Sequence, residues 1–520
     1  MSTYLVIDLL IIILPLIVSF LPYLSYYKKW PSVLFSIIAG GLFYVSWDII
    51  ATMRGDWSFN PEHVLGIYLF GLPLEEVLFF VFVPYSLLLT YEQTAYYIKE
   101  RIVPWKKEAG YIAGVLLLLA SFLYAGKNYT FMALFSSGVV LLLMSRFYSR
   151  TMKKLAYWVY IITGFLLFIL FNYFLTSLPV VMYNPSAVTG IRFLTIPLED
   201  FFYNYAMLSL YLAAYLWAEK RAATIQRILV LGRFHFVFGG LLLYTLGYML
   251  AIVSAVPFSL DRFIWGYAIL FFAHLSVSYS NDLFDAKGDR ISKPTMFSGG
   301  SGVLVKHPEL AKTAKKIALS LIALSFAAAI GFIYAYGFSP LLLLYVLIGN
   351  ICGWYYSAPP LRFSHRLYGN MIFALTVCIL VPGFGNYIAS GTVTSGMWIF
   401  SIPLLFYGYA FTIGVQIPDI ESDRINQKKN YASTFGERTS YRTIAAFCLL
   451  ASASIYAIPY MFPGRLDYGI FLLFSLLPLA SSLYGLASGR QKTERNIMLI
   501  ISSIFLFTAL CDAYLVMMYL

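Results

Sequence analysis

Two clusters of acidic residues stand where long apolar segments give way to basic loops. The first reads Asn281-Asp282-x-x-Asp285-x-x-x-Asp289, and the second reads Asp419-x-x-x-Asp423. Spacings of three to four residues place side chains on one face of a helix. Hard cations such as Mg²⁺ bind carboxylate oxygens and keep other coordination positions for phosphate oxygens. The clusters therefore predict a Mg²⁺ site for a diphosphate, and the candidate metal ligands are Asp282, Asp285, Asp289, Asp419 and Asp423.

Basic residues follow both clusters. Arg290 and Lys293 come after the first, and Lys428 and Lys429 come after the second. Cations in these positions suit a diphosphate leaving group, because they neutralise the charge that develops as it departs. The alternative is that each cluster is only a solvated acidic end of a helix. Two clusters with the same flanking charge favour the metal and diphosphate site.

Composition places the 520-residue chain in a lipid bilayer. Hydrophobic residues make up 60% and charged residues 12%, and the mean hydropathy is +0.77. A soluble fold could not bury so much apolar surface. The sequence predicts an all-α polytopic membrane protein with about sixteen apolar segments long enough to cross a bilayer. These segments lie near residues 4–24, 33–51, 64–92, 110–126, 129–146, 155–177, 188–218, 234–256, 262–281, 312–336, 340–356, 368–389, 397–417, 440–461, 468–487 and 497–519.

The basic residues predict the orientation of these segments. If the segments alternate, one side of the membrane holds all but five of the 36 Lys and Arg residues, the exceptions being Arg54, Lys127, Arg192, Arg262 and Arg465. Cytoplasmic loops carry the basic excess. We therefore expect an integral protein of the cell (inner) membrane with both termini outside and both aspartate clusters inside. The net charge of +12 reflects this orientation, and no concentrated basic patch suggests a nucleic acid partner.

The first 220 residues contain an internal repeat. A shift of 124 residues aligns Phe59-Asn60-Pro61 with Tyr183-Asn184-Pro185, and Pro73-Leu74-Glu75-Glu76 with Pro197-Leu198-Glu199-Asp200. Eight of the 22 positions from 59 to 80 are identical without a gap, and Asp48 aligns with Asn172. Each repeat, 1–97 and 127–220, has three predicted segments, and the linking segment 110–126 makes their orientation parallel. A pseudo-twofold axis along the membrane normal then brings the two acidic pairs to the same depth.

The acidic pairs Glu75-Glu76 and Glu199-Asp200 are the candidate catalytic groups of this half. Glu75 lies about eleven residues into segment 64–92, which at roughly 1.5 Å per residue predicts a position near the middle of the bilayer. An ionised carboxylate there costs at least ~2.5 kcal/mol, so the group is expected to stay protonated. Such a group can act as a general acid, even toward an alkene, if the resulting cation is stabilised. The aromatic rings of Phe79, Phe80 and Tyr203 are candidates for that role.

Two alternatives remain for the acidic pairs. They could be hydrogen-bonding groups of a proline-kinked helix. They could also couple protons to transport, because transporters combine internal repeats with buried acids. The second alternative gives the aspartate clusters no task.

Residues 1–220 resemble the small, flavin-independent membrane lycopene cyclases. The motifs at 73–80 and 197–202 are similar to that family's signature, Pro-x-Glu-(Glu/Asp)-x-x-Phe-Phe. In that family the two repeats are often separate subunits, whereas here they would be fused. The second Phe pair is displaced by two positions, so that Tyr203 and Asn204 align with Phe79 and Phe80. The resemblance implies a carotenoid substrate, and the displacement leaves it open whether both repeats have equal roles.

Residues 234–520 resemble the UbiA-type membrane prenyltransferases, with nine predicted segments. Both aspartate motifs and the loop Tyr356-Ser357-Ala358-Pro359-Pro360-x-Arg362 carry the resemblance. It implies that Mg²⁺ is held by the five aspartates with help from Asn281. It also implies that the diphosphate meets Arg290, Lys293, Arg362, Lys428 or Lys429. Lys293-Pro294 stands where the family often has Arg-Pro, and anchoring at the membrane interface is the alternative for Tyr356 and Arg362.

Together the two resemblances imply a bifunctional enzyme of carotenoid biosynthesis. The favoured reading is Mg²⁺-dependent elongation of lycopene with dimethylallyl diphosphate, followed by redox-neutral, acid-catalysed cyclisation of the end groups to a cyclic C50 carotenoid. The alternative is a C40 lycopene cyclase fused to a prenyltransferase for another acceptor, such as a quinone precursor or a lipid. Ring type, donor length, order of steps and oligomeric state stay open.

Overall fold

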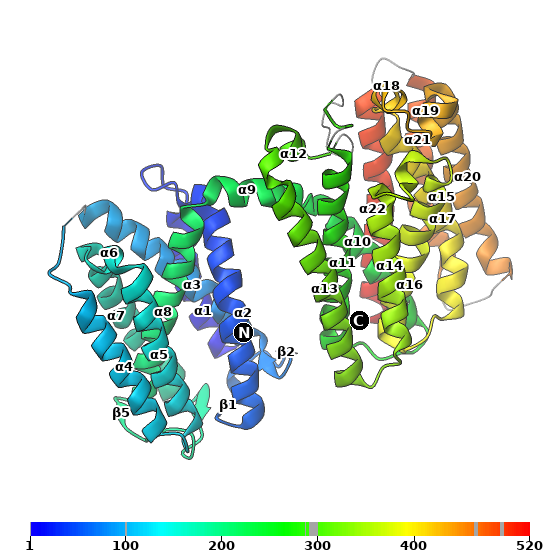
Figure 1. Cartoon of the computed structure of the whole chain (residues 1–520). Coiled ribbons are helices and arrows are strands. Elements are labelled where there is room, and N and C mark those ends of the chain that lie inside the picture. Colours follow the sequence, from blue (N-terminus) through cyan, green and yellow to red (C-terminus); the bar gives the residue numbers. More distant parts are fainter. Residues whose placement is uncertain (1, 99–100, 287, 291–299, 462–465, 489–492) are drawn as a thin grey trace. The chain divides into compact units, whose positions relative to one another are not determined.

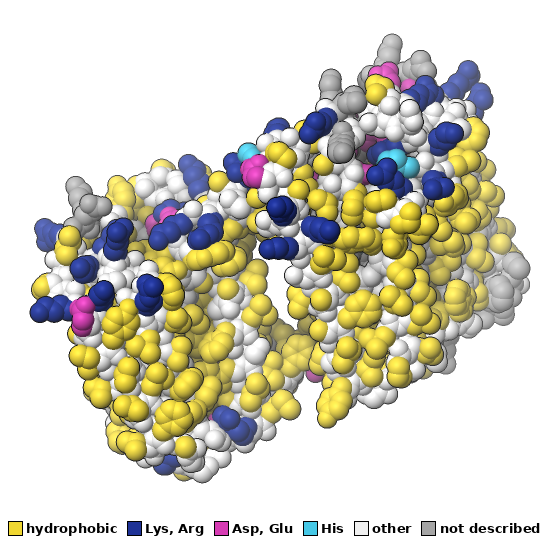
Figure 2. Space-filling view, in the orientation of Figure 1, with side chains coloured by type: hydrophobic (Ala, Val, Ile, Leu, Met, Phe, Trp, Pro, Cys, Tyr) yellow, Lys and Arg dark blue, Asp and Glu magenta, His cyan; other side chains and the backbone are white. Residues whose placement is uncertain are grey.

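The computed structural model describes residues 2–98, 101–286, 288–290, 300–461, 466–488 and 493–520. The chain divides into two compact units, Met1–Gln226 and Arg227–Leu520 (Figure 1). Each of the sixteen predicted segments contains a helix, and twelve helices among the described residues are long and apolar enough to cross a membrane. The predicted all-α polytopic fold is therefore confirmed. On the face shown in Figure 2, hydrophobic side chains cover the flanks of the helices in each unit, and Lys and Arg gather mainly toward one end.

Unit 1 consists of two similar halves joined by one helix. The first half has α1 (Thr3–Val18), η1 (Tyr26–Lys29), α2 (Trp30–Arg54), β1 (Trp57–Phe59), η2 (Pro61–His63), β2 (Tyr68–Leu69), β3 (Leu72–Pro73) and α3 (Leu74–Ile98). After α4 (Lys107–Leu123), the second half has α5 (Asn128–Phe147), α6 (Ser149–Met152), α7 (Leu155–Ser177), β4 (Val181–Tyr183), β5 (Arg192–Phe193), β6 (Ile196–Pro197) and α8 (Leu198–Glu219). α9 (Ala222–Leu231) leads into unit 2.

A pair of short strands joins the two halves of unit 1. β1 pairs antiparallel with β4, with Trp57 opposite Tyr183, Ser58 opposite Met182 and Phe59 opposite Val181. Ser58 and Met182 are 124 residues apart, which is the shift that aligns the two repeats. The central pair of this ladder therefore joins equivalent positions of the two repeats, as expected for a twofold-symmetric pairing. The helices follow the same symmetry, because α2 packs on α8 and α3 packs on α7. The arrangement brings the third helix of each half against the second helix of the other.

The acidic pairs lie at the start of a helix, so the helical path from which their depth was predicted is wrong. α3 begins at Leu74 and α8 at Leu198, so Glu75 stands in a first turn rather than eleven residues into a helix. The hairpins β2–β3 and β5–β6 occupy the preceding residues. Their turns hold Phe70 and Leu194, again 124 residues apart, at φ values of 54° and 55°. A left-handed residue interrupts a helix, which is why these apolar stretches turn before the helices begin.

Unit 2 is a bundle of long helices with short helices at its loops. The elements are α10 (Phe234–Val253), α11 (Leu260–Asp285), α12 (Val303–Lys306), η3 (Pro308–Leu310), α13 (Ala311–Tyr336), α14 (Leu341–Ser357) and η4 (Phe363–His365). One kinked span follows, made of α15 (Gly369–Leu375), the π-turn η5 (Thr376–Leu380) and α16 (Val381–Ser390). The remaining elements are α17 (Ser395–Gln416), α18 (Ile420–Ile425), α19 (Tyr431–Phe435), α20 (Glu437–Met461), α21 (Tyr468–Ser488) and α22 (Thr493–Tyr519).

Glycines let α10 and α16 approach closely. A Cβ atom on Gly247 would lie 1.8 Å from the carbonyl oxygen of Pro382, and one on Gly385 would lie 2.2 Å from that of Tyr244. Inside a membrane, such small residues allow helix backbones to come into van der Waals contact. The two contacts fix these helices against each other at the centre of the unit.

We expect Gly247→Ala to destabilise unit 2 by about 1–3 kcal/mol, because the backbone of α16 must shift to admit the methyl group. Gly396→Ala is the matched control, since Gly396 lies in α17 and a Cβ there meets nothing within 4 Å. Thermal unfolding of the detergent-purified protein measures both. Equal stability of the two variants would contradict the predicted close contact.

Candidate functional sites

Unit 1 encloses a cavity of about 360 Å³ between helices of both repeats. Leu10 and Leu14 of α1 line it and are 63% and 66% exposed, so the cavity reaches the hydrophobic flank of the unit. The polar side chains that line it are Tyr4, Asp48, Glu76, Gln93, Tyr129, Asn172, Tyr183, Asp200, Tyr203 and Asn204, with Ser86 and Thr90. An apolar molecule that enters from the bilayer would thus meet one group of polar side chains.

Glu76 and Asp200, the second acid of each pair, face this cavity. The Tyr4 hydroxyl donates to Glu76 Oε2 at 2.6 Å, and the Tyr129 hydroxyl donates to Asp200 Oδ1 at 2.5 Å. Asp200 Oδ2 accepts two more hydrogen bonds, from Asn172 Nδ2 and from the Tyr183 hydroxyl, both at 2.8 Å. Burial and the nearby Asp200 charge raise the pKa of Tyr183 well above its usual value, so this phenol stays a donor.

Glu75 and Glu199, the first acid of each pair, are buried but do not line the cavity. Glu75 Oε1 accepts hydrogen bonds from Leu65 N at 2.7 Å and from the Ser2 hydroxyl at 2.5 Å. Glu199 Oε1 accepts equivalent bonds from Thr189 N at 2.6 Å and from the Thr130 hydroxyl at 2.7 Å. Both glutamates therefore hold the loop that precedes their own helix.

The three predicted aromatic residues Phe79, Phe80 and Tyr203 line the cavity, and so does Asn204. Phe201 instead stacks on Phe165 at a centroid distance of 6.2 Å. The aligned positions of the two repeats thus face the same space, although the residue types differ. Ring faces at these positions can stabilise a carbocation that forms beside Glu76 or Asp200.

Unit 2 encloses a second cavity, of about 340 Å³, whose lining is mostly apolar. Leu242, Leu270, Val346 and Phe373 are typical of the lining. Asn281, Tyr356 and Arg233 are among its few polar members. Because Asn281 directly precedes Asp282, this cavity adjoins the first aspartate cluster.

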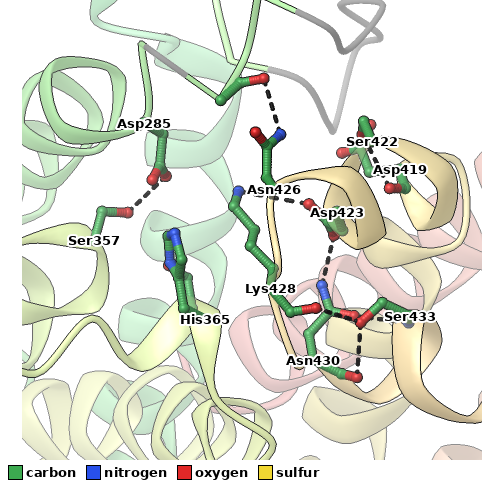
Figure 3. A network of polar contacts seen from close by, with 12 residues as sticks. Asp285, Ser357, His365, Asp419, Ser422, Asp423, Asn426, Lys428, Asn430 and Ser433 are labelled. Carbon is green, nitrogen blue, oxygen red and sulfur yellow. Dashed lines mark hydrogen bonds and ion pairs between the residues drawn. The ribbon is translucent and has the colours of Figure 1, made fainter.

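The structure brings the two aspartate clusters together at one end of unit 2 (Figure 3). The Asn426 side chain, from the second cluster's loop, donates to the Gly288 carbonyl oxygen of the first at 3.1 Å. Asp285 Oδ2 accepts from the Ser357 hydroxyl at 2.8 Å, and Asp423 Oδ2 accepts from Asn430 Nδ2 at 2.6 Å. Residues more than 130 positions apart in the chain therefore form one acidic site.

Lys428 lies among the aspartates. Its Nζ is 3.5 Å from Asp423 Oδ1. Burial opposes the charge of Lys428, but the fields of Asp285, Asp423, Asp289 and Asp419 outweigh it and raise the pKa of this lysine. Burial, and next the charge of Asp285, raise the pKa of Asp289 to about 7. This environment favours added positive charge.

The donor set fits Mg²⁺. Within the described residues, no three His, Cys, Asp or Glu side chains stand close enough together to hold a metal ion as they are placed. Four of the predicted aspartates, Asp285, Asp289, Asp419 and Asp423, nevertheless supply hard oxygen donors around Lys428. Asp282 interacts with Arg233, and among the described residues Asn281 Oδ1 is buried without a hydrogen-bond partner. Asp282 accepts hydrogen bonds from both the backbone and the hydroxyl of Ser301. These carboxylate and amide oxygens are the groups that would hold Mg²⁺.

The remaining predicted contacts lie at the rim of this acidic site. Arg290, Arg362 and Lys429 are exposed. Lys429 N donates to the His365 carbonyl oxygen at 3.0 Å, which ties the second cluster to the loop after α14. Lys293 lies outside the described residues. The exposed cations are free to reorient toward a diphosphate.

Arg233 was missed by the sequence analysis. It precedes α10, lines the cavity of unit 2 and interacts electrostatically with Asp282, Asp289 and Asp419. Burial lowers the pKa of Arg233, although these carboxylates oppose the shift. In the sequence, Arg233 is only a basic residue that precedes an apolar segment. Basic residues that determine membrane orientation occur in the same position, so this pattern does not identify a site residue.

Comparison with known proteins supports the two-part organisation. Residues 240–507 match the UbiA prenyltransferase family, and residues 1–94 and 126–218 match the lycopene cyclase family. The 1,4-dihydroxy-2-naphthoate octaprenyltransferase of Bacillus subtilis (strain 168) is 22% identical over 204 residues, which are 39% of this chain and 64% of that protein. The match thus spans less than two thirds of that relative.

Solved structures of UbiA homologs are also similar. Two from Archaeoglobus fulgidus, one bound to GPP and Mg²⁺ and one to DMAPP and Mg²⁺, are each 20% identical with a TM-score of 0.43, and cover 55% of this chain and 98% of theirs. The apo structure of a homolog from Aeropyrum pernix K1 is 17% identical with a TM-score of 0.41, and covers 54% of this chain and 98% of its own. From the family matches, the chain belongs to the UbiA prenyltransferase family and carries a lycopene cyclase domain before its UbiA domain.

Proposed function

We propose that the chain is a bifunctional carotenoid enzyme that prenylates lycopene in unit 2 and closes rings on its end groups in unit 1. The observation that carries the proposal is the apolar lining of the unit 2 cavity, which adjoins the aspartate clusters. An apolar polyene suits this lining better than a charged acceptor does. The cyclase domain on the same chain supports a carotenoid as the shared substrate.

In the prenyltransferase step, the C–O bond of dimethylallyl diphosphate breaks and the electron pair leaves with pyrophosphate. The terminal alkene of lycopene then forms a C–C bond to the allyl cation, and the new tertiary cation loses a proton. Mg²⁺ held by Asp282, Asp285, Asp289, Asp419 and Asp423 would supply positive charge for the departing pyrophosphate. Lys428 lies among four of these aspartates, all except Asp282, and Arg290, Arg362 and Lys429 stand at the rim. We propose that these cations, with Tyr356 and Asn281, orient the diphosphate.

In the cyclase step, a carboxyl group protonates the end-group alkene and the neighbouring internal double bond attacks the cation. A second carboxylate removes a ring proton, so no net redox change occurs. The cavity of unit 1 supports this reaction, because carboxyl groups and aromatic rings line one apolar space. Water is the competing nucleophile for the cation, and the apolar lining limits its access.

The side of the membrane is also part of the proposal. The two aspartate motifs share one end of unit 2, and this end carries a basic excess in the predicted topology. We therefore propose that the diphosphate site faces the cytoplasm.

The test uses membranes that contain the full-length protein. Lycopene, dimethylallyl diphosphate and Mg²⁺ are added, and the carotenoid products are analysed by mass and by chromatographic retention. We expect products that have gained five-carbon units and carry rings. Rings on a product with the mass of lycopene would instead support a C40 cyclase joined to a prenyltransferase for another acceptor.

That second candidate has one observation in its favour. The Bacillus subtilis (strain 168) relative is named for an aromatic acceptor, dihydroxynaphthoate. Adding an aromatic quinone precursor to the same membranes distinguishes the two functions. Prenylation of the aromatic acceptor with lycopene left unextended would favour the second candidate.

We expect Lys428→Gln to raise the KM for dimethylallyl diphosphate about 10- to 100-fold, because a charge-assisted contact contributes about 1.5–3 kcal/mol. Lys315→Gln is the control, since Lys315 is an exposed lysine on α13. Initial rates at varied diphosphate concentration measure both. A KM for Lys428→Gln equal to that of the control would remove Lys428 from the diphosphate site.

A further inference from the structure

The two repeats surround their cavity-facing acids with almost the same groups. A tyrosine of the first helix, Tyr4 or Tyr129, donates to Glu76 or Asp200. The aligned residues Asp48 and Asn172 approach the same two acids from the second helix. The repeats differ in chemistry at this last position, where one has a carboxyl group and the other an amide.

In the first repeat, the Asp48 and Glu76 carboxyl groups both line the cavity and interact closely enough to share a hydrogen bond. Two carboxyl groups can share a hydrogen bond only if one of them carries a proton, because an ionised carboxylate has no donor. Asp48 Oδ2 is buried without a hydrogen-bond partner in the described part of the chain, which would be unfavourable for an ionised group. The geometry therefore keeps a proton on the Asp48–Glu76 pair.

A further acid stands beside this pair. Asp8 lies on α1, one turn after Tyr4, and is fully buried. Among the residues that the structure describes, neither of its carboxyl oxygens has a hydrogen-bond partner, and it interacts electrostatically with Glu76 and Glu75. An ionised carboxylate without a donor is strongly disfavoured in such a place, so Asp8 adds no charge that would draw the proton away. In the second repeat, the corresponding position one turn after Tyr129 is Ala133.

In the second repeat, Asp200 accepts hydrogen bonds from three donors, Tyr129, Asn172 and Tyr183. Three donors directed at one carboxyl group stabilise its ionised form. None of the three can share an acidic proton with it in the way Asp48 does with Glu76. The environment of Asp200 is thus that of a base, whereas that of Glu76 is that of an acid.

We propose that the two repeats divide the cyclase reaction, with Glu76 of the first repeat as proton donor and Asp200 of the second as proton acceptor. This inference rests on the proposed cyclase function and assigns its roles. A C–H bond forms with the proton of Glu76, the internal alkene closes the ring, and Asp200 takes a ring proton as the new double bond forms. Return of that proton to the Asp48–Glu76 pair restores both groups, so the cycle consumes none. Asp48 is a positioning residue that shares this proton with Glu76.

The test supplies lycopene, dimethylallyl diphosphate and Mg²⁺ to membranes in deuterated buffer. Carboxyl protons exchange with solvent, so the wild type is expected to place one deuterium in each ring it closes. Glu76→Gln is expected to leave the ends of the recovered acyclic carotenoid free of deuterium. Asp200→Asn is expected to close at least tenfold fewer rings while deuterium still enters the acyclic ends, because protonation and its reversal at Glu76 continue.

Two exchanges between the repeats sharpen the assignment. Asp48→Asn, which gives the first repeat the amide of the second, is expected to reduce deuterium entry about tenfold. Asn172→Asp, which gives the second repeat the carboxyl of the first, is expected to slow ring closure but not deuterium entry. Prenyl transfer by unit 2 of each variant reports that the chain is folded. If Asp48 had only a structural role, Asp48→Asn would reduce deuterium entry and prenyl transfer together.

The outcomes separate the inference from the proposed function. A wild type that closes no rings overturns the cyclase function and this inference with it. Rings without deuterium, equal behaviour of Glu76→Gln and Asp200→Asn, or the reverse of the expected pattern would overturn the division of roles and leave the cyclase function standing.

Discussion

Asp285→Asn is expected to reduce the addition of five-carbon units about 10²–10³-fold while leaving ring closure intact. The asparagine keeps an oxygen that can accept the Ser357 hydroxyl, which now lies 2.8 Å from Asp285 Oδ2. It removes one of the negative charges around Lys428, where Mg²⁺ and the diphosphate are proposed to bind. Loss of one preorganised electrostatic group at a reacting centre has effects of this size. The masses of carotenoids formed from lycopene and dimethylallyl diphosphate measure it.

Glu421→Gln is the matched control. Glu421 lies between Asp419 and Asp423, but its side chain is exposed. The substitution removes the same charge a few residues away and is expected to leave prenyl transfer unchanged. If Asp285→Asn retained the rate of this control, the aspartate clusters would have no part in ionising the diphosphate.

Glu76→Gln has the second large expected effect, a loss of about 10²–10⁴-fold in ring closure, the range for removal of a general acid. Glutamine keeps an oxygen for the Tyr4 hydroxyl, which lies 2.6 Å from Glu76 Oε2, but it has no acidic proton. Prenyl transfer should continue, so acyclic prenylated carotenoids are expected to accumulate. Chromatography of the carotenoid products measures the ratio of acyclic to cyclic species.

Glu62→Gln provides the control for this variant. Glu62 lies in η2, in the loop before α3, and is exposed. We expect wild-type products from it. Cyclic products from Glu76→Gln at the control rate would show that the acid lies elsewhere.

The convergence of the aspartate clusters was predictable, because the motif spacing and the parity of the membrane segments both place them on one side. The identity of the cavity-facing acids was not. Which side of a helix a residue faces depends on where the helix begins, and α3 begins ten residues later than expected because a hairpin precedes it. Phe70 adopts a left-handed conformation in the turn of this hairpin. Glycine usually occupies that conformation, so a phenylalanine at this position does not predict the turn.

The groups around the acids were only partly predictable. The alignment of Asp48 with Asn172 was visible from the repeat, but its contact with Glu76 required the packing of α2 beside α3. Tyr4 and Asp8 were hidden in an apolar segment that had no counterpart in the motif alignment. A single polar residue such as Arg233 depends on contacts between distant elements, and its local sequence does not distinguish it from residues that face lipid headgroups.

The strand pair between β1 and β4 has a consequence for how the front unit can change over time. The strand of each repeat pairs with the strand of the other, so each repeat supplies backbone hydrogen-bond partners to its counterpart. Substitutions that preserve the β1–β4 pairing keep the two repeats joined. Side chains away from this pairing can then differ between the repeats. A duplicated ancestor with two equal halves could in this way become a molecule whose halves perform unlike tasks without ever losing their common frame.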